Sequence, residues 1–255
     1  MNTYVDSILR SVNNTAIRQR HLNVVIDPMY GVSRRALETV LYTCRCNCDT
    51  IHAAHDTLFG GRLPAPDEGT LFDLQNFVIQ HKRDIGIATD GDADRLGIID
   101  EKGNYIHPNK ILTVLYYYLL KYKGWKGPAV RNIATTHVLD KIAESFGEIC
   151  YEVPVGFKYI SAKMQDKDAL IGGESSGGLT VRGHIRGKDG IYAASLMLEM
   201  LAVTGKALSE VIEEMEAQYG KTYMTERNFT YSPERKEELL DTLFVQRNCQ
   251  SLIGK

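Results

Sequence analysis

The sequence predicts an α/β protein of two consecutive three-layer α/β domains with mixed, largely parallel sheets. Short apolar runs typical of buried strands alternate with segments of helical periodicity. The alternation begins again after a turn near Gly103–Pro108, which marks a domain boundary. The 255 residues are 44% hydrophobic and 24% charged, an ordinary globular composition with room for two domains. We therefore predict domains at residues 1–105 and 106–220, followed by a polar, poorly patterned tail at 221–255.

The first half of the sequence predicts alternating strands and helices. Ser33 is a plausible N-cap for the first helix that follows a strand. The later helix carries one apolar stripe, formed by Leu71, Leu74, Phe77 and Val78. The expected strands are Leu22–Asp27, a segment near Thr43–His52, Asp84–Thr89 and Arg95–Asp100, and the expected helices are Ser33–Leu41 and Thr70–His81.

The second half repeats this alternation of strands and helices. The two halves could therefore be related copies, which the pattern alone does not prove. We expect the apolar run Ile111–Leu120 to form a core helix, amphipathic in pattern, in which Tyr116, Tyr117 and Tyr118 serve packing. The expected strands are Pro128–Ala134, Glu148–Val153 and Ala169–Gly173, and the expected helices are Pro108–Tyr122, Val138–Phe146, Tyr159–Lys167, Asp189–Val203 and Leu208–Gln218.

Charge and composition exclude several classes of function. The formal net charge of −2 provides no basic surface for nucleic acid. The ten-residue run Ile111–Leu120 is shorter than the roughly 20 residues that span a bilayer, and the N-terminus lacks a signal-peptide pattern. Five cysteines without a CxxC motif favour a reducing compartment. We expect a cytoplasmic protein with no nucleic-acid or membrane partner.

Three of the cysteines, Cys44, Cys46 and Cys48, alternate along the chain. On a strand they would all point to one face. Burial of free cysteines is common, so we interpret them as packing residues. Adventitious metal binding or redox sensitivity is the weaker alternative.

The stretch "ATDGDADRLGIID" is the most informative in the chain. Asp90, Asp92 and Asp94 would repel one another without a counter-charge, but together they can bind a hard cation such as Mg²⁺ or Ca²⁺. A calcium EF-hand is excluded because Arg95 stands where its turn needs glycine and because the flanks read as strands. Arg95 could hold a phosphate oxygen. The alternative is a polar turn whose acids are merely solvated.

A second stretch, "IGGESSGGLTVRGHIRGKDGI", combines glycines with polar side chains. Glu174, Ser175 and Ser176 could exchange hydrogen bonds with a polyol, whereas a plain flexible loop or a phosphate cradle are alternatives; the standard phosphate-binding spacings are absent. His184 could contact a substrate or lie on the surface. Lys188, and Lys158 in "GFK" upstream, would each by default be a surface charge.

The string "TDGDADR" resembles the metal-binding loop of the α-D-phosphohexomutases, the phosphoglucomutase/phosphomannomutase superfamily. Five further motifs occur in the family's order, and the resemblance covers about residues 1–220. They are "VVIDPMYGVS", "FGGRLPAPDEG", "VGFKYI", "GGESSGG" and "GKDGI". The resemblance implies domains 2 and 3 of a four-domain enzyme, with 221–255 beginning a linker. "TASHNP"-type and "RxSGTxP" strings do not occur. We therefore expect a fragment that lacks the phosphoserine and the N- and C-terminal domains, and that is inactive alone.

The resemblance also implies roles for individual residues. Mg²⁺ would bind to the three aspartates, Arg95 and Lys158 would be catalytic, and a hexose phosphate would be the substrate. The parent enzyme would interconvert hexose 1-phosphate and hexose 6-phosphate through a phosphoserine and a bisphosphate. Substrate contacts are expected from Glu174, Ser176, Lys188 and His184.

Three other functions compete with this one. Phosphoglucosamine mutase belongs to the same superfamily. A non-catalytic module that binds Mg²⁺ or a sugar phosphate would use the same two loops. A metal-dependent phosphatase could use Asp90 as its nucleophile, although the second loop and the lysines fit that reaction poorly.

Overall fold

The structure, a computed structural model, describes residues 2–224 and 231–245. It divides into two compact units, residues 1–221 and 222–255. The described part of the second unit contains α10 (Pro233–Leu240) and one further turn, Asp241–Val245. Ser232 caps α10 by accepting a hydrogen bond from the backbone N–H of Arg235, and Pro233 occupies its first turn. The tail thus contains a helix that the sequence pattern did not reveal. Residues 225–230 and 246–255 of the predicted linker lie outside the described residues.

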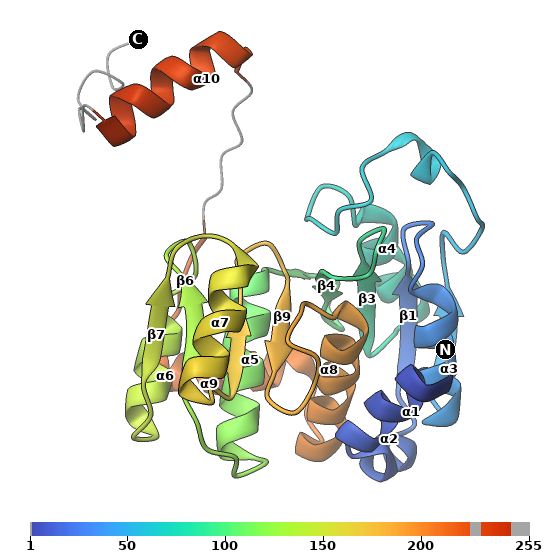
Figure 1. Ribbon diagram of the computed structural model, residues 1–255. Helices are drawn as coiled ribbons and strands as arrows, with labels where there is room; N and C mark the ends of the chain where they lie inside the picture. The colour runs from blue at the N-terminus through green and yellow to red at the C-terminus, as the bar shows by residue number, and fades with distance from the viewer. Residues whose placement is uncertain (1, 225–230, 246–255) are drawn as a thin grey trace. The chain divides into compact units, whose positions relative to one another are not determined.

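The first unit contains two sheets (Figure 1). The first has the strand order β2-β1-β3-β4-β5. The strands β1, β2 and β3 are parallel, and β4 and β5 are added antiparallel. These strands are β1 (Asn23–Asp27), β2 (Asn47–Thr50), β3 (Ile85–Thr89), β4 (Leu96–Ile99) and β5 (Tyr105–Ile106).

The second sheet repeats this topology. Its order is β7-β6-β8-β9, with β6, β7 and β8 parallel and β9 antiparallel. Both sheets therefore share one strand order: the first strand in the chain lies between the second and the third, and an antiparallel fourth strand pairs with the third. This shared order supports the interpretation of the halves as related copies. These strands are β6 (Ala129–Asn132), β7 (Cys150–Val153), β8 (Ile171–Gly173) and β9 (Leu179–Val181).

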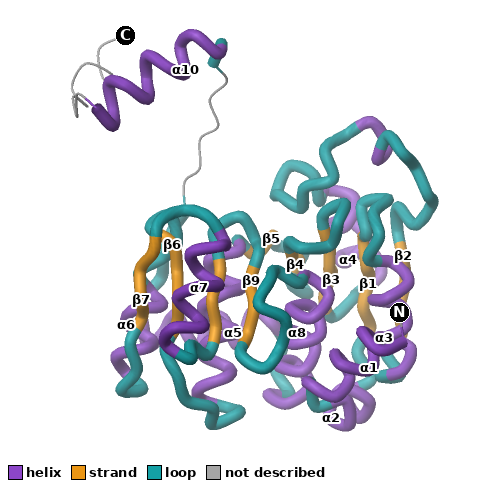
Figure 2. The backbone as a smooth tube through the Cα atoms, viewed as in Figure 1, coloured by secondary structure: helices purple, strands orange, loops and turns teal. Residues whose placement is uncertain are grey.

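Helices cover both faces of each sheet, so the predicted three-layer α/β class is confirmed (Figure 2). On the first sheet, α4 packs against one face, and α3 and α8 pack against the other. On the second, α7 covers one face and α5 and α6 the other. The helices are α1 (Asn2–Ser11), α2 (Asn14–Arg20), α3 (Arg34–Thr43), α4 (Phe72–His81), α5 (Pro108–Lys121), α6 (Val138–Ser145), α7 (Phe157–Lys167), α8 (Gly190–Thr204) and α9 (Leu208–Tyr219).

One hydrophobic cluster joins the two sheets. It contains side chains of β1 and β3, of the second sheet, and of α5 and α8. The prediction of a core helix over Ile111–Leu120 is confirmed, but α5 is not amphipathic, because these residues are buried on every side of it. The packing role of Tyr116, Tyr117 and Tyr118 is confirmed, since all three are fully buried. A helix that is apolar all round belongs inside a core.

Two expectations about β2 also change. The strand begins only at Asn47, so Cys44 and Cys46 lie before it and only Cys48 lies within it. Cys44 and Cys46 are nevertheless buried. Burial raises the pKa of the Cys46 thiol to about 12 and that of Cys48 to about 11. Thiols of such high pKa are poor nucleophiles and metal ligands, which favours the packing interpretation.

No single helix in the described residues is long and apolar enough to cross a membrane. Taken together, α8 and α9 meet the length and composition test, but they are bent by 83°. Most of α8 is buried inside the unit, as in the core helices of globular proteins.

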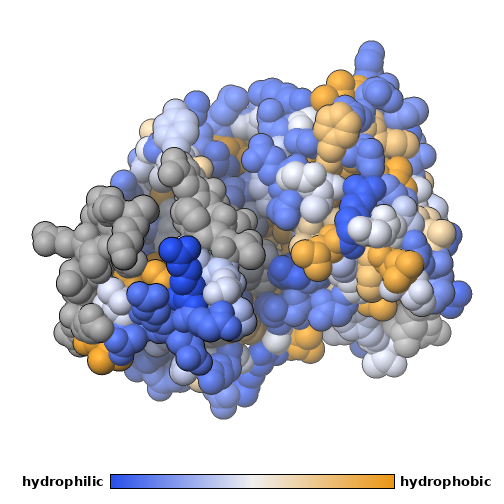
Figure 3. Space-filling view, turned by 90° about the horizontal axis from the view of Figure 1, so that it is seen from above, coloured by the Kyte–Doolittle hydropathy of each residue, from blue (hydrophilic) through white to orange (hydrophobic). Residues whose placement is uncertain are grey.

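The carboxyl ends of the parallel strands open on one face of the first unit, seen from above in Figure 3. On the side of the first sheet, hydrophobic residues gather among hydrophilic ones. The long connection between β2 and α4 exposes two leucines, Leu58 and Leu63, which are 75% and 80% exposed.

Candidate functional site

The two informative loops occupy equivalent places in the two sheets. Residues 90–95 connect β3 to β4, and residues 174–178 connect β8 to β9. The loops touch, because the backbone N–H of Leu96 donates to the carbonyl of Gly177 over 3.2 Å. Gly177 has φ +101°, and a Cβ there would lie 3.0 Å from the Leu96 carbonyl oxygen. Glycine is needed at this position for both reasons.

The three aspartates converge. Asp90, Asp92 and Asp94 each offer a carboxylate oxygen, and these oxygens lie within 4.8 Å of one another. Asp90 is buried, Asp94 is half-buried and Asp92 is exposed, so the cluster opens towards solvent. Three oxygen donors with open coordination positions match the preferences of Mg²⁺. The residues therefore fit the expected cation.

The loop around the aspartates is held from inside. Asp90 Oδ1 accepts hydrogen bonds from the backbone N–H groups of Asp94 (2.9 Å) and Arg95 (3.0 Å). Asp90 Oδ2 lies 2.5 Å from Arg95 Nε. Ala93 adopts φ +66°, an uncommon backbone conformation for a residue other than glycine. The buried carboxylate thus fixes the turn that presents the other two.

Neighbouring segments support this loop from outside. Gly91 donates its N–H to the carbonyl of Pro64 (3.2 Å), and its carbonyl accepts from Val32 (3.1 Å). A Cβ on Gly31 would lie 2.6 Å from the Gly91 carbonyl oxygen. The motifs "VVIDPMYGVS" and "FGGRLPAPDEG" therefore act as supports for the aspartate loop. Ser33 begins α3 without a side-chain capping bond, and its hydroxyl instead accepts from Thr89 over 2.7 Å.

Lys188 links the second half of the chain to the aspartates. Its Nζ lies 2.6 Å from Asp94 Oδ2. Burial raises the pKa of Asp94, the Lys188 ammonium opposes that rise, and the charges of Asp90 and Asp92 add to it. Burial would lower the pKa of Arg95, but hydrogen bonding and charge from Asp90 raise it. The three carboxylates outnumber their two cationic partners, which favours binding of a further cation.

The N-terminus of α8 also faces this loop. Gly190 donates its N–H to the carbonyl of Ala93 over 3.0 Å, and a Cβ on Gly190 would lie 2.8 Å from the Arg95 carbonyl oxygen. The positive end of the helix dipole stabilises nearby negative charge. Asp189 caps α8 by accepting from the N–H of Tyr192 over 2.9 Å.

Glu174 and Ser176 lie together at the tip of the second loop. The Ser176 hydroxyl is 3.5 Å from Glu174 Oε2, and Asn132 Nδ2 is 3.5 Å from Glu174 Oε1. Both contacts are long, so the carboxylate keeps capacity to accept further hydrogen bonds. Sequence reasoning missed Asn132. Its position at the end of β6, next to the end of β8 in a parallel pair, was the available signal.

Two predicted site residues lie apart from these loops. Lys158 is exposed in the first turn of α7, with Nζ 4.9 Å from the centre of the Tyr159 ring. The His184 side chain is buried, its Nε2 lies 2.7 Å from Asp189 Oδ2, and its ring stacks on Tyr192 at 4.0 Å. His184 therefore contacts the cap of α8. Burial would raise the pKa of Asp189, but hydrogen bonds from His184 and other donors lower it.

Two similar α/β sheets bring an aspartate loop and a glycine-rich polar loop into contact, and family models and relatives that match the chain assign this arrangement to the α-D-phosphohexomutase superfamily. Within it, the chain belongs to the phosphoglucomutase/phosphomannomutase family. The model of alpha/beta/alpha domain II matches residues 2–103, and that of domain III matches residues 107–219.

Individual relatives agree with this assignment. A phosphoglucomutase/phosphomannomutase of Thermococcus kodakarensis is 32% identical over 216 residues, which cover 85% of this chain and 47% of the relative. A phosphoglucosamine/phosphogalactosamine mutase of Sulfurisphaera tokodaii is 31% identical, with 86% and 48% covered. The structure of a candidate phosphomannomutase from Thermus thermophilus superposes with a TM-score of 0.82 at 33% identity, covering 86% of this chain and 51% of that one. The chain thus spans about half the length of the relatives it matches.

Proposed function

We propose that these residues form the metal-binding and sugar-binding part of a phosphohexomutase that interconverts hexose 1-phosphate and hexose 6-phosphate. One observation carries the proposal: Lys188 and Leu96 join the glycine-rich loop to the aspartate loop. A cation site and a polyol site that touch can bind the phosphoryl end and the hydroxyl end of one small molecule.

Each loop has its own role in this proposal. Asp90, Asp92 and Asp94 would hold Mg²⁺, which when bound balances negative charge on a phosphoryl group. Arg95 orients that group by hydrogen bonding. Catalysis of phosphoryl transfer rests on such positioning and on electrostatic stabilisation.

The remaining residues act on the sugar. Glu174 accepts hydrogen bonds from the sugar hydroxyls, and Ser176 both donates hydrogen bonds to them and accepts from them. These contacts select the orientation of the sugar ring. Lys188, held at the junction of the loops, neutralises charge at a phosphate or hydroxyl oxygen. Lys158, exposed at the start of α7, would reach the substrate only from the solvent side. The phosphoserine and the bisphosphate stage belong to sequence outside these 255 residues in this proposal.

The structure disfavours the phosphatase alternative. A nucleophilic aspartate must be free to attack phosphorus, but hydrogen bonds to both oxygens of the buried Asp90 carboxylate fix it in the turn, which suits a group held in place beside a cation better than an attacking group. Phosphoglucosamine mutase stays an alternative, because relatives of that activity match the chain to a similar degree. A non-catalytic binding module would use the same loops.

An NMR titration of the ¹⁵N-labelled chain with Mg²⁺ tests the proposal. Glucose 1-phosphate, mannose 1-phosphate and glucosamine 1-phosphate would be added separately. We expect one sugar to shift the amides of Gly172–Gly178 together with those of Asp90–Arg95. Glu174→Ala should abolish the selectivity between the sugars, and Asp92→Asn should weaken all three. Absence of shifts in both loops would contradict the proposed site.

Mutase activity is the second measurement. The 255 residues alone should not interconvert the two hexose phosphates, whereas they should still bind them. A robust rate from the pure chain, lost in Asp92→Ala, would show that the phosphoryl carrier lies within these residues. Binding without turnover under any condition, including the longer protein, would favour the non-catalytic module.

A further inference from the structure

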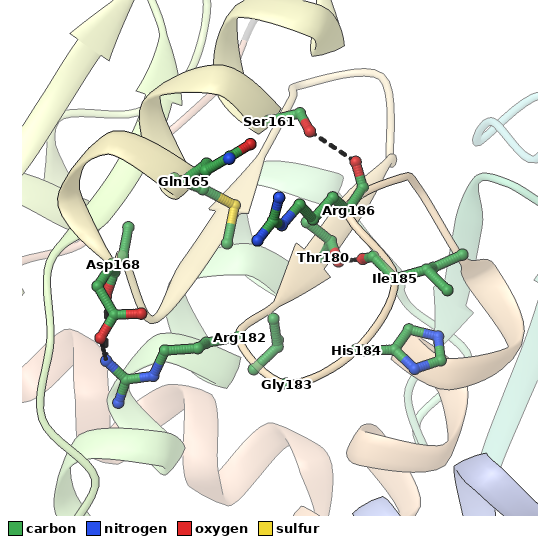
Figure 4. A pocket seen from close by; sticks show the side chains of 12 residues that line it. Ser161, Gln165, Asp168, Thr180, Arg182, Gly183, His184, Ile185 and Arg186 are labelled. Carbon is green, nitrogen blue, oxygen red and sulfur yellow. Dashed lines mark hydrogen bonds and ion pairs between the residues drawn. The ribbon is translucent and has the colours of Figure 1, made fainter.

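A cavity of about 280 Å³ lies beside the second sheet, apart from the two loops of the proposed site (Figure 4). It is bounded by α7, by β9 and by the connection between β9 and α8. Its volume is just below the usual range for ligand pockets, about 300–1,000 Å³, so it suits a compact ligand. Nothing in the proposed mutase function uses it.

The floor of the cavity is apolar. Met164, Ala169 and Val181 line it, and all three are buried. The rim is polar and includes two arginines, Arg182 and Arg186. An apolar floor with few polar groups at the edge is the usual composition of a small-molecule site.

The two arginines differ in their partners. Arg182 is paired: its guanidinium donates to Asp168 Oδ2 over 3.0 Å and to the Lys126 carbonyl over 2.7 Å. Arg186 points into the cavity beside Gln165 and Thr180 (Figure 4). Among the residues that the structure describes, its guanidinium has no ion pair or hydrogen bond. Because Asp168 neutralises Arg182, the cavity presents one uncompensated positive charge.

The wall that carries Arg186 is already fixed in place. The Ser161 hydroxyl donates to the Arg186 carbonyl over 2.7 Å, and the Thr180 hydroxyl donates to the Ile185 carbonyl over 2.6 Å. The neighbouring His184 is held by Asp189. A ligand would therefore meet a wall that needs little ordering, which lowers the entropic cost of binding.

We propose that this cavity binds a small oxyanion, a phosphate or carboxylate group attached to a compact flat or apolar body. The Arg186 guanidinium receives the oxyanion in two parallel hydrogen bonds, and the body rests on Met164, Ala169 and Val181. This site is separate from the hexose phosphate site and goes beyond the proposed mutase function.

An NMR titration of the ¹⁵N-labelled full chain with phenyl phosphate tests the proposal, with benzyl alcohol as the uncharged match and sodium benzoate as the carboxylate. We expect saturable shifts at Ser161, Thr180 and Gly183 with both anions and none with benzyl alcohol. Arg186→Gln should weaken binding about tenfold, as expected for loss of a charge-assisted hydrogen bond. Saturation with only one anion would identify the oxyanion as phosphate or carboxylate.

Two further variants distinguish binding in this cavity from binding elsewhere on the chain. Gln165→Trp, at an exposed helix position on the rim, should block the cavity and abolish the shifts while leaving the fold intact. Arg35→Gln removes an exposed arginine on α3 and should change nothing. Phenyl phosphate shifts confined to Asp90–Arg95 or Glu174–Gly178 would overturn the proposal. Unsaturable shifts, or an equal loss of binding in Arg35→Gln, would overturn it as well.

Discussion

Lys188 Nζ lies 2.6 Å from Asp94 Oδ2, so a side chain that follows the second sheet contacts a carboxylate at the end of the first. The lysine reaches it by crossing Gly178. A Cβ on Gly178 would lie only 2.1 Å from Lys188 Cδ. The absence of a side chain at residue 178 therefore sets the path of Lys188.

Gly178→Ala should displace Lys188 from Asp94. The methyl group and the lysine stem cannot share the same space, and the stem is the more flexible of the two. We expect several-fold weaker binding of hexose 1-phosphate with a change in unfolding free energy below about 1 kcal/mol. Isothermal titration calorimetry and urea unfolding would measure the two. Gly187→Ala is the matched control, because a Cβ there meets no atom within 4 Å. Equal effects of the two variants would contradict this account.

Asp92→Asn and Asp90→Asn should have different consequences. Asp92 is exposed, so its neutralisation should lower Mg²⁺ affinity about tenfold or more and leave the melting temperature unchanged. Asp90 is buried and bonds Arg95 and two backbone N–H groups. Its replacement should also destabilise the fold, by about 1–3 kcal/mol. Calorimetric titration with Mg²⁺ and thermal melting give the readouts, and an unchanged Mg²⁺ affinity in Asp92→Asn would remove the aspartate loop as the cation site.

Because of Glu214, the free energy of unfolding should decrease at acidic pH. Burial would raise the pKa of Glu214, but hydrogen bonds from Lys121, Lys206 and two tyrosines outweigh it and lower the pKa to about 2. The unfolded chain, with the ordinary value near 4.5, binds the proton more readily as pH falls. The contribution is therefore complete above about pH 4.5 and is lost towards pH 2; we expect about 1–3 kcal/mol.

Urea unfolding between pH 6 and pH 2.5 would measure that loss. Glu214→Gln should flatten the pH profile in this range. Glu213→Gln is the control, because Glu213 is 65% exposed and makes one long ion pair with Lys102. A profile for Glu214→Gln as steep as that of the unchanged protein would count against the assignment.

Lys123→Met should destabilise the protein strongly. Glu199 is fully buried, and it accepts from Lys123 (2.6 Å), from the Tyr118 hydroxyl (2.6 Å) and from the Asn13 backbone (2.8 Å). Removal of the lysine leaves a buried carboxylate without its cation, a change that costs about 3–5 kcal/mol. Unfolding at pH 7 would show it. The double variant Lys123→Met with Glu199→Leu should recover part of the loss, and additive effects would disprove the coupling.

The long elements and both loops could be predicted from sequence because their signals are local. Helical periodicity identified α4 and α6, and the apolar runs around the aspartates identified β3 and β4. The strands β5 and β9 were missed because they have two and three residues, too few for a period to show. The tail helix α10 was missed because it is short and mostly charged, with leucines only at its C-terminal end and no apolar stripe.

The site was predictable residue by residue but not as an arrangement. The string "TDGDADR" predicts a cation-binding loop, and the string "GESSGG" predicts a polar turn. The contacts between them, such as Lys188 with Asp94, join residues far apart in the chain, and no local pattern encodes those. His184 shows the same limit, because its partner Asp189 was visible in the sequence only as the first residue of an expected helix.

The position of α8 has a consequence for the order in which the chain is made. This helix covers one face of the first sheet, touching β3 and β4, yet it follows the whole second sheet in the sequence. As the chain leaves the ribosome, the first sheet has all its strands, but the part of one face over β3 and β4 stays uncovered until α8 emerges. That apolar part of the face, next to α3, stays exposed while the second half is still being translated, which makes the incomplete chain prone to aggregation.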